Sequence, residues 1–411
     1  MKFCLIGEKL GHSYSEKIHR LRGLSYVLKE IPPHALEAFL EDNEFDGFNV
    51  TIPYKKSVAA KLARISERAK EAGAVNTVVK KNGVLCGYNT DFGGLQYTFR
   101  RMGIDIKGKN AMILGSGGAA ATAHAVLAAE GAAEIYCVSR KGELNYSNYG
   151  SCTDTDILVN ATPVGMYPNA GECPVDLDKL PRLSAVVDCV YNPYRTELLM
   201  RAEKRGAVCS NGLPMLVEQA LLAEDIWLGA EHEEDETEKI INIIKRDTLN
   251  IVLSGMPSCG KTTLGRLVAE KTGRKFYDVD GYIYEKCGRT PAEIINAEGE
   301  AAFREIEKKA VKLLGAKSGA VIACGGGSVC FPENVAALKS NGIIVYIKRD
   351  INLLTDDGRP VSAKTGIKEL FEKRAGIYES TADAELENAG PAEKCAEEII
   401  KAYETACYKR T

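Results

Sequence analysis

The sequence predicts an α/β protein that contains two nucleotide-binding parts. Twice, a short apolar run leads into a glycine-rich turn and then a helical pattern, first after Ala111–Leu114 and again after Leu249–Ser254. A strand, a glycine turn and a helix N-terminus direct backbone N–H groups at a phosphate, so both stretches indicate nucleotide binding. A length of 411 residues is enough for two or three domains.

Composition narrows the class of protein. A net charge of −3 gives no electrostatic reason to expect nucleic acid as a partner, and no apolar run is long enough to span a membrane. The thirteen cysteines and five histidines are scattered without metal-ligand spacing. We therefore expect free thiols, a cytoplasmic location and small-molecule partners, with the oligomeric state, a homo-oligomer included, left open.

Polar side chains mark the ends of the first predicted strands. Ser13 and Ser15 lie in a turn that opens a helix, where helix capping alone would explain them. Asn49 and Thr51 alternate with apolar residues and should face one side of a strand. Pro53 then ends this strand, which places Lys55 just beyond it.

Two further polar clusters follow. Gly73–Thr77 contains Asn76, and Gly87–Gly94 contains Asp91, which would also suit the start of a helix over Phe92–Met102. Farther along, a helix over residues 211–220 carries Gln219 on the same face as a methionine four residues earlier.

A βαβ unit begins at Ala111. The strand Ala111–Leu114, the turn after it, a helix over Thr122–Glu130 and a strand over Glu134–Val138 are typical of a dinucleotide-binding domain. NAD sites usually carry an acidic residue after the second strand, but here Arg140 follows it and suits the 2′-phosphate of NADP. Only nineteen residues separate Arg140 from Asn160, so we expect an edge helix and strand to be absent.

These ordered stretches resemble the shikimate dehydrogenase family, from Met1 to about Leu228. The resemblance implies a substrate-binding domain over residues 1–92, completed by 212–228, and a Rossmann-type NADP domain over 93–211. It implies a shikimate pocket lined by Ser13, Ser15, Asn49, Thr51, Asn76, Asp91 and Gln219. It also implies that Lys55 and Asp91 form a catalytic pair that supplies a proton while NADPH reduces a ketone. The implied cofactor residues are Gly115, Ser116, Gly117, Gly118, Ala119, Arg140, Asn160, Thr162 and Met166.

An acidic run separates this part from the next. Glu231–Glu238 has six acids in eight residues, which is typical of a solvated linker, here taken as residues 229–247. Lys239–Arg246 adds isoleucines and a basic end, and acids first with cations last would favour a short helix.

The second glycine turn is a complete P-loop. Gly255–Thr262 matches G-x-x-x-x-G-K-[ST], in which the lysine reaches the β- and γ-phosphates and the last hydroxyl binds Mg²⁺. Beyond it, a strand over Lys275–Val279 should place Asp278 and Asp280 on one side, opposite the P-loop.

Three later features complete the predicted site. Arg304 lies among acids on a helix, where surface salt bridges would also explain it. Gly325–Gly327 allows a ligand to approach the backbone closely. Asp357–Pro360 lies in a polar loop before a helix over Lys368–Ala375 and is a candidate lid.

From about Thr248 onward the chain resembles shikimate kinase, which implies an NMP-kinase-like P-loop domain with a parallel sheet over 248–411. The resemblance implies that Asp280, Arg304, Arg374 and the backbone of Gly325, Gly326 and Gly327 hold shikimate. It implies that Asp280 accepts the proton of the attacking hydroxyl, and that Lys261 and Arg359 offset charge on the transferred phosphoryl group. Mg²⁺ would be held by Thr262 and Asp278, partly through water. The implied ATP-binding residues are Gly255, Ser258, Gly260, Lys261, Thr262 and Thr263.

The two resemblances predict one bifunctional enzyme that uses NADPH, ATP and Mg²⁺ to make shikimate and then phosphorylate it. One alternative makes the kinase-like half a weak enzyme or an ATP-sensing regulatory module. Another joins a quinate-type dehydrogenase to a kinase for a different small alcohol, against which Arg140, Arg304 and Arg374 argue.

Overall fold

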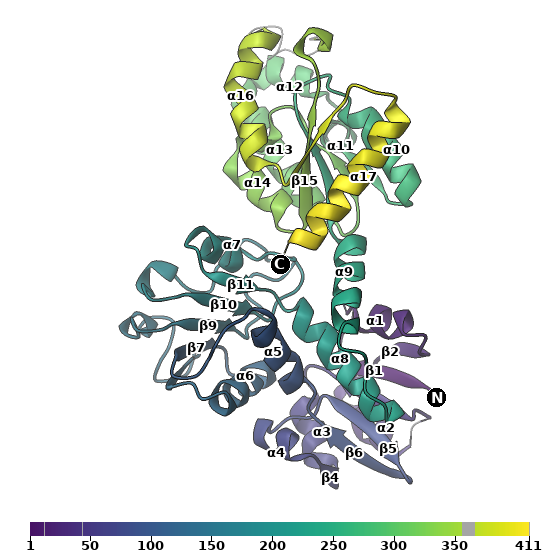
Figure 1. Cartoon of the computed structure of the whole chain (residues 1–411), viewed down its shortest axis with the longest axis vertical. Coiled ribbons are helices and arrows are strands. Elements are labelled where there is room, and N and C mark those ends of the chain that lie inside the picture. Colours follow the sequence, from purple (N-terminus) through teal and green to yellow (C-terminus); the bar gives the residue numbers. More distant parts are fainter. Residues whose placement is uncertain (12, 43, 356–365, 411) are drawn as a thin grey trace. The chain divides into compact units, whose positions relative to one another are not determined.

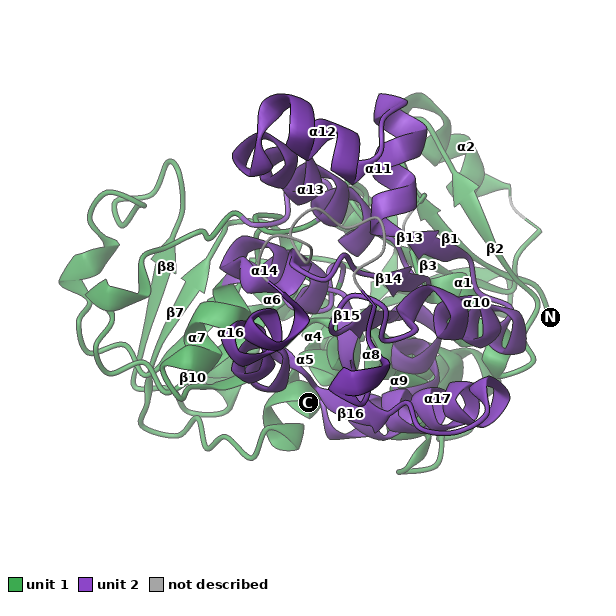
Figure 2. Ribbon diagram, turned by 90° about the horizontal axis from the view of Figure 1, so that it is seen from above, with its two compact units in different colours: residues 1–166, 172–191, 198–241 green, residues 167–171, 192–197, 242–411 purple. Residues whose placement is uncertain are grey.

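The computed structural model describes residues 1–411 except 12, 43, 356–365 and 411. The chain divides into two compact units (Figures 1 and 2). The first comprises residues 1–166, 172–191 and 198–241, and the second comprises residues 167–171, 192–197 and 242–411. Both are α/β units, as the sequence predicts, because parallel strands alternate with helices along most of the chain.

The first unit begins with a six-stranded sheet in the order β2-β1-β3-β5-β6-β4. Its strands are β1 (Phe3–Gly7), β2 (Tyr26–Glu30), β3 (Gly47–Val50), β4 (Arg64–Ile65), β5 (Thr77–Lys81) and β6 (Val84–Tyr88). Its helices are α1 (Ser15–Leu21), α2 (Leu36–Glu41), α3 (Lys55–Lys61) and α4 (Glu67–Ala72). The sheet is mixed, since β1 pairs in parallel with β2 and β3 whereas β3 pairs antiparallel with β5. Every residue of β1 and β3 is buried, as expected for central strands covered on both faces.

A distant helix completes this first core. Helix α8 (Leu213–Leu228) returns to the six-stranded sheet, where the Trp227 ring stacks on Phe3 with centroids 4.5 Å apart. The Trp227 indole also donates to the Val78 carbonyl at 2.9 Å. Gly47 makes room for it, since a Cβ there would lie 2.5 Å from the indole nitrogen. The first sheet is therefore closed by a segment that follows the second sheet in sequence.

The second sheet of this unit has five parallel strands in the order β11-β10-β9-β7-β8. They are β7 (Asn110–Leu114), β8 (Glu134–Val138), β9 (Ile157–Asn160), β10 (Ala185–Asp188) and β11 (Val208–Ser210), accompanied by α5 (Asp91–Arg101), α6 (Gly118–Ala129) and α7 (Glu197–Lys204). Only a 3₁₀ turn, Tyr149–Ser151, lies between β8 and β9, and β8 is an edge strand. The expected shortening after Arg140 is therefore seen.

The second unit contains a five-stranded parallel sheet in the order β13-β14-β12-β15-β16. The strands are β12 (Asn250–Ser254), β13 (Phe276–Asp278), β14 (Val321–Ala323), β15 (Gly342–Lys348) and β16 (Ala384–Glu387). The helices are α10 (Lys261–Thr272), α11 (Val279–Cys287), α12 (Pro291–Glu298), α13 (Glu300–Gly315), α14 (Pro332–Lys339), α16 (Ile367–Thr381) and α17 (Ala392–Lys409). Strand β12, which leads into the P-loop, is central in this sheet.

Helix α9 (Glu236–Thr248) begins near the end of the acidic run and continues beyond it, and the boundary between the two units falls after its residue Ile241. Its acids come first and its cations last, the arrangement that the helix dipole favours. The first turn is bound to the first unit: Arg101 Nε donates to Glu238 at 2.5 Å, and Tyr97 donates to the same carboxylate at 2.7 Å. Glu238 is thus part of a folded surface rather than a solvated linker acid.

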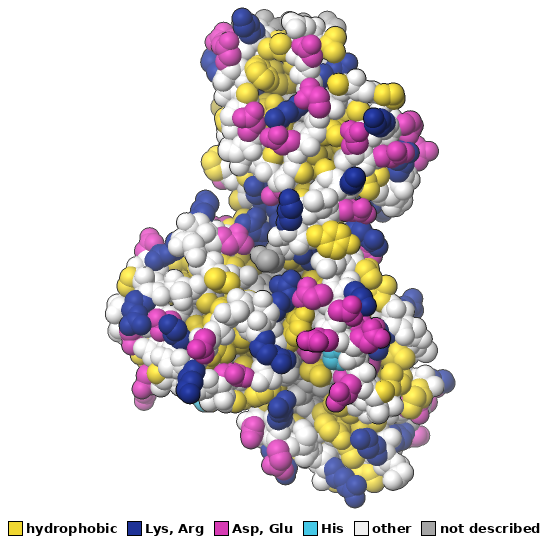
Figure 3. All heavy atoms as spheres, in the orientation of Figure 1, with side chains coloured by type: hydrophobic (Ala, Val, Ile, Leu, Met, Phe, Trp, Pro, Cys, Tyr) yellow, Lys and Arg dark blue, Asp and Glu magenta, His cyan; other side chains and the backbone are white. Residues whose placement is uncertain are grey.

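Surface charge and the state of the cysteines agree with the composition. On the face shown in Figure 3, acidic and basic side chains are interspersed on both units, and all thirteen cysteines are free. No helix in the described ranges combines the length and apolar character that crossing a membrane requires.

Candidate active sites

The first candidate site is centred on an ion pair. Lys55 begins α3 and Asp91 begins α5, and the Lys55 ammonium lies 2.5 Å from Asp91 Oδ2 with both side chains largely buried. The pair lies next to the first glycine turn, because a Cβ on Gly118 would come within 3.7 Å of Lys55 Cδ. The Lys55–Asp91 pair therefore lies beside the N-terminus of the helix that follows the first glycine turn.

Asn76 connects this pair to the rest of the site. Its amide nitrogen donates to Asp91 Oδ1 at 2.9 Å and approaches Gln219 Oε1 at 3.3 Å. Its amide oxygen accepts from the Thr90 backbone N–H at 2.8 Å, which fixes the orientation of the amide. Asn76 immediately precedes β5, Asp91 begins α5 and Gln219 lies on α8, so these three predicted site residues lie together.

Asn49 extends the same network. It accepts a hydrogen bond from the Tyr26 hydroxyl at 2.7 Å and donates to Thr77 Oγ1 at 3.1 Å. Strand β3 ends at Val50, so Thr51 lies just beyond the strand instead of continuing its alternation.

Ser13 and Ser15 form a separate pair. Their hydroxyls are 3.1 Å apart, and the Ser15 N–H donates to Ser13 Oγ at 3.2 Å. The N-cap of α1 is Tyr14, and no side-chain capping bond is present, so helix capping does not explain the serines. The ring of Tyr14, which lies between the two serines in sequence, packs on the ring of Tyr191 with centroids 5.2 Å apart. Burial raises the pKa of the Tyr191 hydroxyl to about 12. Tyr191 therefore stays protonated at neutral pH and can act as a hydrogen-bond donor.

Two glycines allow α5 and α8 to bring these residues together. A Cβ on Gly94 would lie 2.6 Å from the Met215 carbonyl and 3.1 Å from Gln219 Cβ, and one on Gly93 would clash with the Leu222 side chain. Close approach of the two helices is what places Gln219 beside Asn76.

The glycine turn after β7 fits a dinucleotide. Gly115 has φ +117°, and a Cβ there would lie 3.0 Å from the Ala161 carbonyl, so only glycine suits this cradle. Helix α6 begins at Gly118 without a side-chain cap, which leaves its first N–H groups for a phosphate. It begins four residues before the predicted helix because the glycine turn itself forms the first helical turn.

The remaining candidate cofactor residues follow strands β8 and β9. Thr162 donates its hydroxyl to Asn160 Oδ1 at 2.7 Å, and Asn160 in turn donates to Asp188 at 2.9 Å. Arg140 is exposed just beyond β8, and Met166 is 45% exposed. Both side chains are accessible to a ligand.

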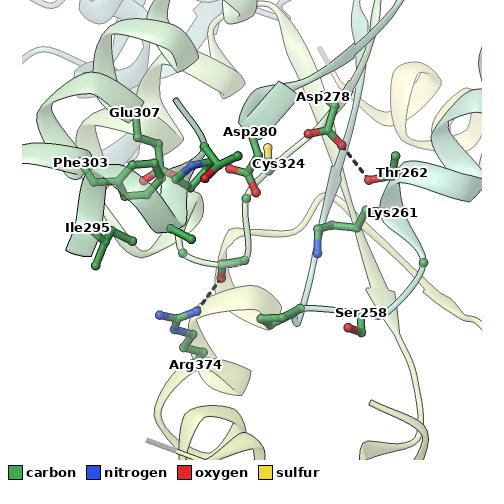
Figure 4. Close-up of a pocket in the computed structure, with 18 of the residues that line it drawn as sticks. Ser258, Lys261, Thr262, Asp278, Asp280, Ile295, Phe303, Glu307, Cys324 and Arg374 are labelled. Carbon is green, nitrogen blue, oxygen red and sulfur yellow. Dashed lines mark hydrogen bonds between the residues drawn. The ribbon is translucent and has the colours of Figure 1, made fainter. Parts of the chain in front are cut away.

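The second candidate site lies at the P-loop (Figure 4). Gly255 and Gly260 have φ values of +141° and +101°, which L side chains rarely adopt. Lys261 is buried, and its ammonium donates to the Gly255 and Met256 carbonyls at 2.9 and 2.8 Å. Thr262 donates to Asp278 Oδ2 at 2.7 Å, so a hydroxyl and a carboxylate oxygen stand together at the start of α10. Such hard oxygen ligands fit Mg²⁺.

Asp278 and Asp280 do not lie on one strand face, and that prediction is wrong. Strand β13 ends at Asp278, which caps α11 by accepting from the Gly281 N–H at 3.1 Å, so Asp280 lies in the first helical turn. Both still line one cavity of about 550 Å³, because the helix begins at its rim.

The three consecutive glycines leave space for functional groups. A Cβ on Gly325 would lie 2.9 Å from Glu307 Oε1 and 3.1 Å from Asp280 Oδ1. A Cβ on Gly327 would lie 2.7 Å from the Arg304 guanidinium, and one on Gly326 would meet Pro257 at 2.9 Å. The backbone at this turn is therefore open to the cavity and closely surrounded by polar side chains.

Arg304 is held between two acids. It donates to Glu300 at 2.7 Å and to Glu307 at 2.8 Å, and Ser328 donates to the other Glu307 oxygen at 2.7 Å. Burial alone would lower the pKa of Arg304, but Glu307 and Glu300 raise it on balance. The salt bridges expected of a surface helix exist, yet the arginine side chain is only 11% exposed and lines the cavity.

Arg374 lies at another wall of the cavity, where it donates to the Gly326 carbonyl at 3.0 Å (Figure 4). The same carbonyl accepts from the Tyr378 hydroxyl. Arg359 and Pro360 of the candidate lid lie outside the described residues.

Sequence reasoning missed several residues of these networks. Glu307 appears in the sequence as one more acid of a charged helix, although it is 1% exposed and holds Arg304. Thr90, Thr77 and Tyr26 are supporting residues whose contacts depend on strands that are distant in sequence.

Fold and geometry together define two classes of enzyme in one chain: a dinucleotide-dependent dehydrogenase with a lysine–carboxylate pair, followed by a P-loop phosphotransferase. Residues 5–78 match the shikimate dehydrogenase substrate binding domain, and residues 257–404 match shikimate kinase. The Clostridium perfringens (strain 13 / Type A) shikimate dehydrogenase (NADP(+)) is 37% identical over 266 residues, covering 59% of this chain and 98% of that protein. The chain therefore belongs to the shikimate dehydrogenase family and carries a shikimate kinase domain after it.

Solved structures agree with this assignment. A chorismate mutase/shikimate 5-dehydrogenase fusion protein from Clostridium acetobutylicum has a TM-score of 0.56 and 36% identity, covering 59% of this chain and 96% of that chain. Shikimate 5-dehydrogenase of Thermus thermophilus, in complex with NADP(H) and shikimate, has a TM-score of 0.54 and 31% identity, with coverage of 59% and 99%.

Proposed function

We propose that this chain reduces 3-dehydroshikimate to shikimate with NADPH and then phosphorylates shikimate with ATP to give shikimate 3-phosphate. The Lys55–Asp91 pair beside the dinucleotide turn carries the first half of the proposal. The Thr262–Asp278 contact, with Asp280 on the same cavity, carries the second.

In the first reaction the chain supplies a proton to the ketone oxygen. NADPH, when bound, supplies the hydride that goes to the carbonyl carbon. Lys55 donates the proton and stabilises the negative charge that develops on oxygen. Asp91, 2.5 Å from the ammonium and held by Asn76 at its other oxygen, orients Lys55 and relays to it the proton, taken from water, that restores the ammonium.

The surrounding polar groups would hold the substrate. Shikimate carries a carboxylate and hydroxyls, which match the hydroxyl and amide groups of the site. We assign this role to Ser13, Ser15, Asn49, Thr51, Asn76 and Gln219. The glycine turn from Gly115 to Ala119, with Asn160, Thr162 and Met166, would hold the dinucleotide, and Arg140 its 2′-phosphate.

In the second reaction the chain activates a hydroxyl and positions two anions. Asp280 accepts the proton of the attacking hydroxyl, while Arg304, Arg374 and the Gly325–Gly327 backbone hold the ring acid. ATP, when bound with Mg²⁺ at Thr262 and Asp278, supplies the phosphoryl group. Lys261 now donates to two P-loop carbonyls, so nucleotide binding would exchange those partners for phosphate oxygens. We assign charge stabilisation to Lys261 together with Arg359.

We further propose the division into a substrate part (1–92 with 212–228), a cofactor part (93–211) and a kinase part (248–411). The thirteen free thiols support a reducing compartment, for which we propose the cytoplasm.

The test is a coupled assay with the purified full chain, 3-dehydroshikimate, NADPH, Mg²⁺ and ATP. The expected final product is shikimate 3-phosphate from the wild type and shikimate from a Lys261→Ala variant. Shikimate from both would retain the dehydrogenase and refute the active kinase. Phosphorylation of added shikimate without oxidation of NADPH would refute the dehydrogenase.

A further inference from the structure

Among the described residues, one cationic side chain of the kinase cavity has a buried Nε–H group without a hydrogen-bond partner. Four cationic side chains line the cavity: Lys261, Arg304, Arg349 and Arg374. Lys261 is bonded to backbone carbonyls, Arg304 to two glutamates and Arg374 to the Gly326 carbonyl. Arg349 differs: its Nε is buried without a hydrogen-bond partner, and no described carboxylate pairs with its guanidinium. A buried, unpaired N–H is costly, so its presence at a binding cavity points to a ligand acceptor.

The position of Arg349 indicates which ligand. Strand β15 pairs with β12 in a parallel register that sets Tyr346 opposite Ser254, the last residue before the P-loop. A Cβ on Gly255 would lie 2.6 Å from the Ile347 carbonyl, so the chain leaves β15 directly against the P-loop. Just after Arg349, the Thr355 carbonyl accepts from Ser258 of the P-loop at 2.8 Å.

The strand order separates Arg349 from the proposed proton acceptor. Asp280 follows β13 and Gly325 follows β14, on one side of β12, whereas Arg349 follows β15 on the other side. Arg349 thus lies on the nucleotide side of the P-loop. A guanidinium fork suits a phosphate, whose oxygens accept two N–H groups at once, while stacking on an aromatic base would leave Nε unpaired.

We propose that Arg349 binds the phosphate chain of the nucleotide and is a nucleotide-binding residue of the kinase half. The predicted effect on the KM for ATP rests on the proposed phosphoryl transfer, because it requires an active kinase. Binding of ADP is independent of turnover, so the two proposals can fail separately.

The experiment compares Arg349→Met, which keeps the length of the side chain without its charge, with Arg349→Lys, which keeps charge but lacks Nε. Lys348→Met is the matched control, because Lys348 pairs with Glu385 at 2.8 Å on the adjoining position. Calorimetry measures Kd for ADP with Mg²⁺, and steady-state kinetics measure KM for ATP and for shikimate, all in the full chain. Unchanged dehydrogenase activity and thermal unfolding serve as the check on folding.

Loss of charge-assisted hydrogen bonds should raise Kd for ADP and KM for ATP about 10- to 100-fold in Arg349→Met. The increase should be smaller in Arg349→Lys and absent in Lys348→Met, with KM for shikimate unchanged within about twofold in all three. Unchanged nucleotide parameters would overturn the proposal, and so would a rise confined to the KM for shikimate, which would assign Arg349 to the substrate carboxylate. If Arg349→Met does not fold, the same readouts on Arg349→Lys decide the question.

Discussion

At the scale of single residues, Asp91 is held at both carboxylate oxygens. Lys55 contacts one at 2.5 Å and Asn76 the other at 2.9 Å. The carboxylate therefore cannot rotate away from the ammonium without breaking a second bond. This arrangement keeps Lys55, the proposed proton donor, beside the dinucleotide turn.

Replacing the lysine tests its role directly. Lys55→Met should lower kcat for reduction of 3-dehydroshikimate about 10²- to 10⁴-fold, because the proton donor is lost. Phosphorylation of added shikimate should be unchanged, as measured in a separate assay. Lys56→Met is the matched control, since Lys56 is exposed on the next position of α3. A similar loss in both variants would contradict the assignment.

Arg140 should govern the choice between the two dinucleotides. Arg140→Ser removes the cation expected to pair with the 2′-phosphate, a loss that should raise KM for NADPH about tenfold or more. KM for NADH, which lacks this phosphate, should change little. Parallel kinetics with both cofactors measure the ratio, and an equal effect on both would indicate a general structural role.

At the scale of elements, helices α5 and α8 bring three of the proposed site residues together because Gly93 and Gly94 carry no side chain. Asp91 begins α5, Gln219 lies on α8, and Asn76 bridges them. The close approach of these two helices therefore determines how the three side chains are arranged.

Gly94→Ala should separate these helices. Its Cβ would lie 2.6 Å from the Met215 carbonyl, a backbone atom that cannot yield like a flexible side chain. We expect overpacking to cost about 1–3 kcal/mol of stability, with a rise in the dehydrogenase KM. Gly376→Ala in α16 is the control: nothing lies within 4 Å of its Cβ, so it should be neutral or stabilising by up to about 1 kcal/mol. Thermal unfolding and kinetics measure both.

The loop between α8 and α9 carries a pH-dependent contact. His232 bonds to Asp225 at 2.8 Å and lies 3.5 Å from Glu218, and these partners, Asp225 first, raise its pKa from 6.5 to about 10. Because the pKa of His232 is higher in the folded state, the protonated histidine stabilises the folded protein. This stabilisation is complete below about pH 6.5 and is lost as the pH rises towards 10. His232→Gln should therefore lower the unfolding temperature of the first unit most near pH 6, with the difference from wild type vanishing near pH 10. A pH-independent difference would contradict this account.

At the scale of the whole molecule, the chain joins two chemistries with different requirements. In the proposed mechanism, dehydrogenation depends on Lys55 as proton donor, whereas phosphoryl transfer depends on a divalent cation held by Thr262 and Asp278. Removing divalent cations with EDTA should abolish formation of shikimate 3-phosphate while leaving reduction of 3-dehydroshikimate unchanged. Product analysis after added Mg²⁺ should show recovery, and loss of both activities would refute this separation.

Much of the fold could be predicted because its signals are local. The strand Glu134–Val138 has its predicted bounds, and the P-loop lies between β12 and α10 as its motif requires. The Asp278–Asp280 prediction failed because an aspartate that suits a strand end also caps a helix. Glu307 and Tyr26 were missed because their contacts depend on tertiary packing, for which neither periodicity nor a motif gives a signal. The roles of the predicted site residues stay proposals.

The return of α8 to the first sheet has a consequence for synthesis on the ribosome. All six strands of that sheet emerge before the helix whose Trp227 bonds to Val78, 149 residues earlier in the chain. At about 5–20 residues per second, the nascent sheet waits roughly 7–30 s for this cover. During that interval Phe3 and its aromatic neighbours lack their stacking partner, so the nascent chain offers an apolar surface to chaperones until the cofactor-binding part has been translated.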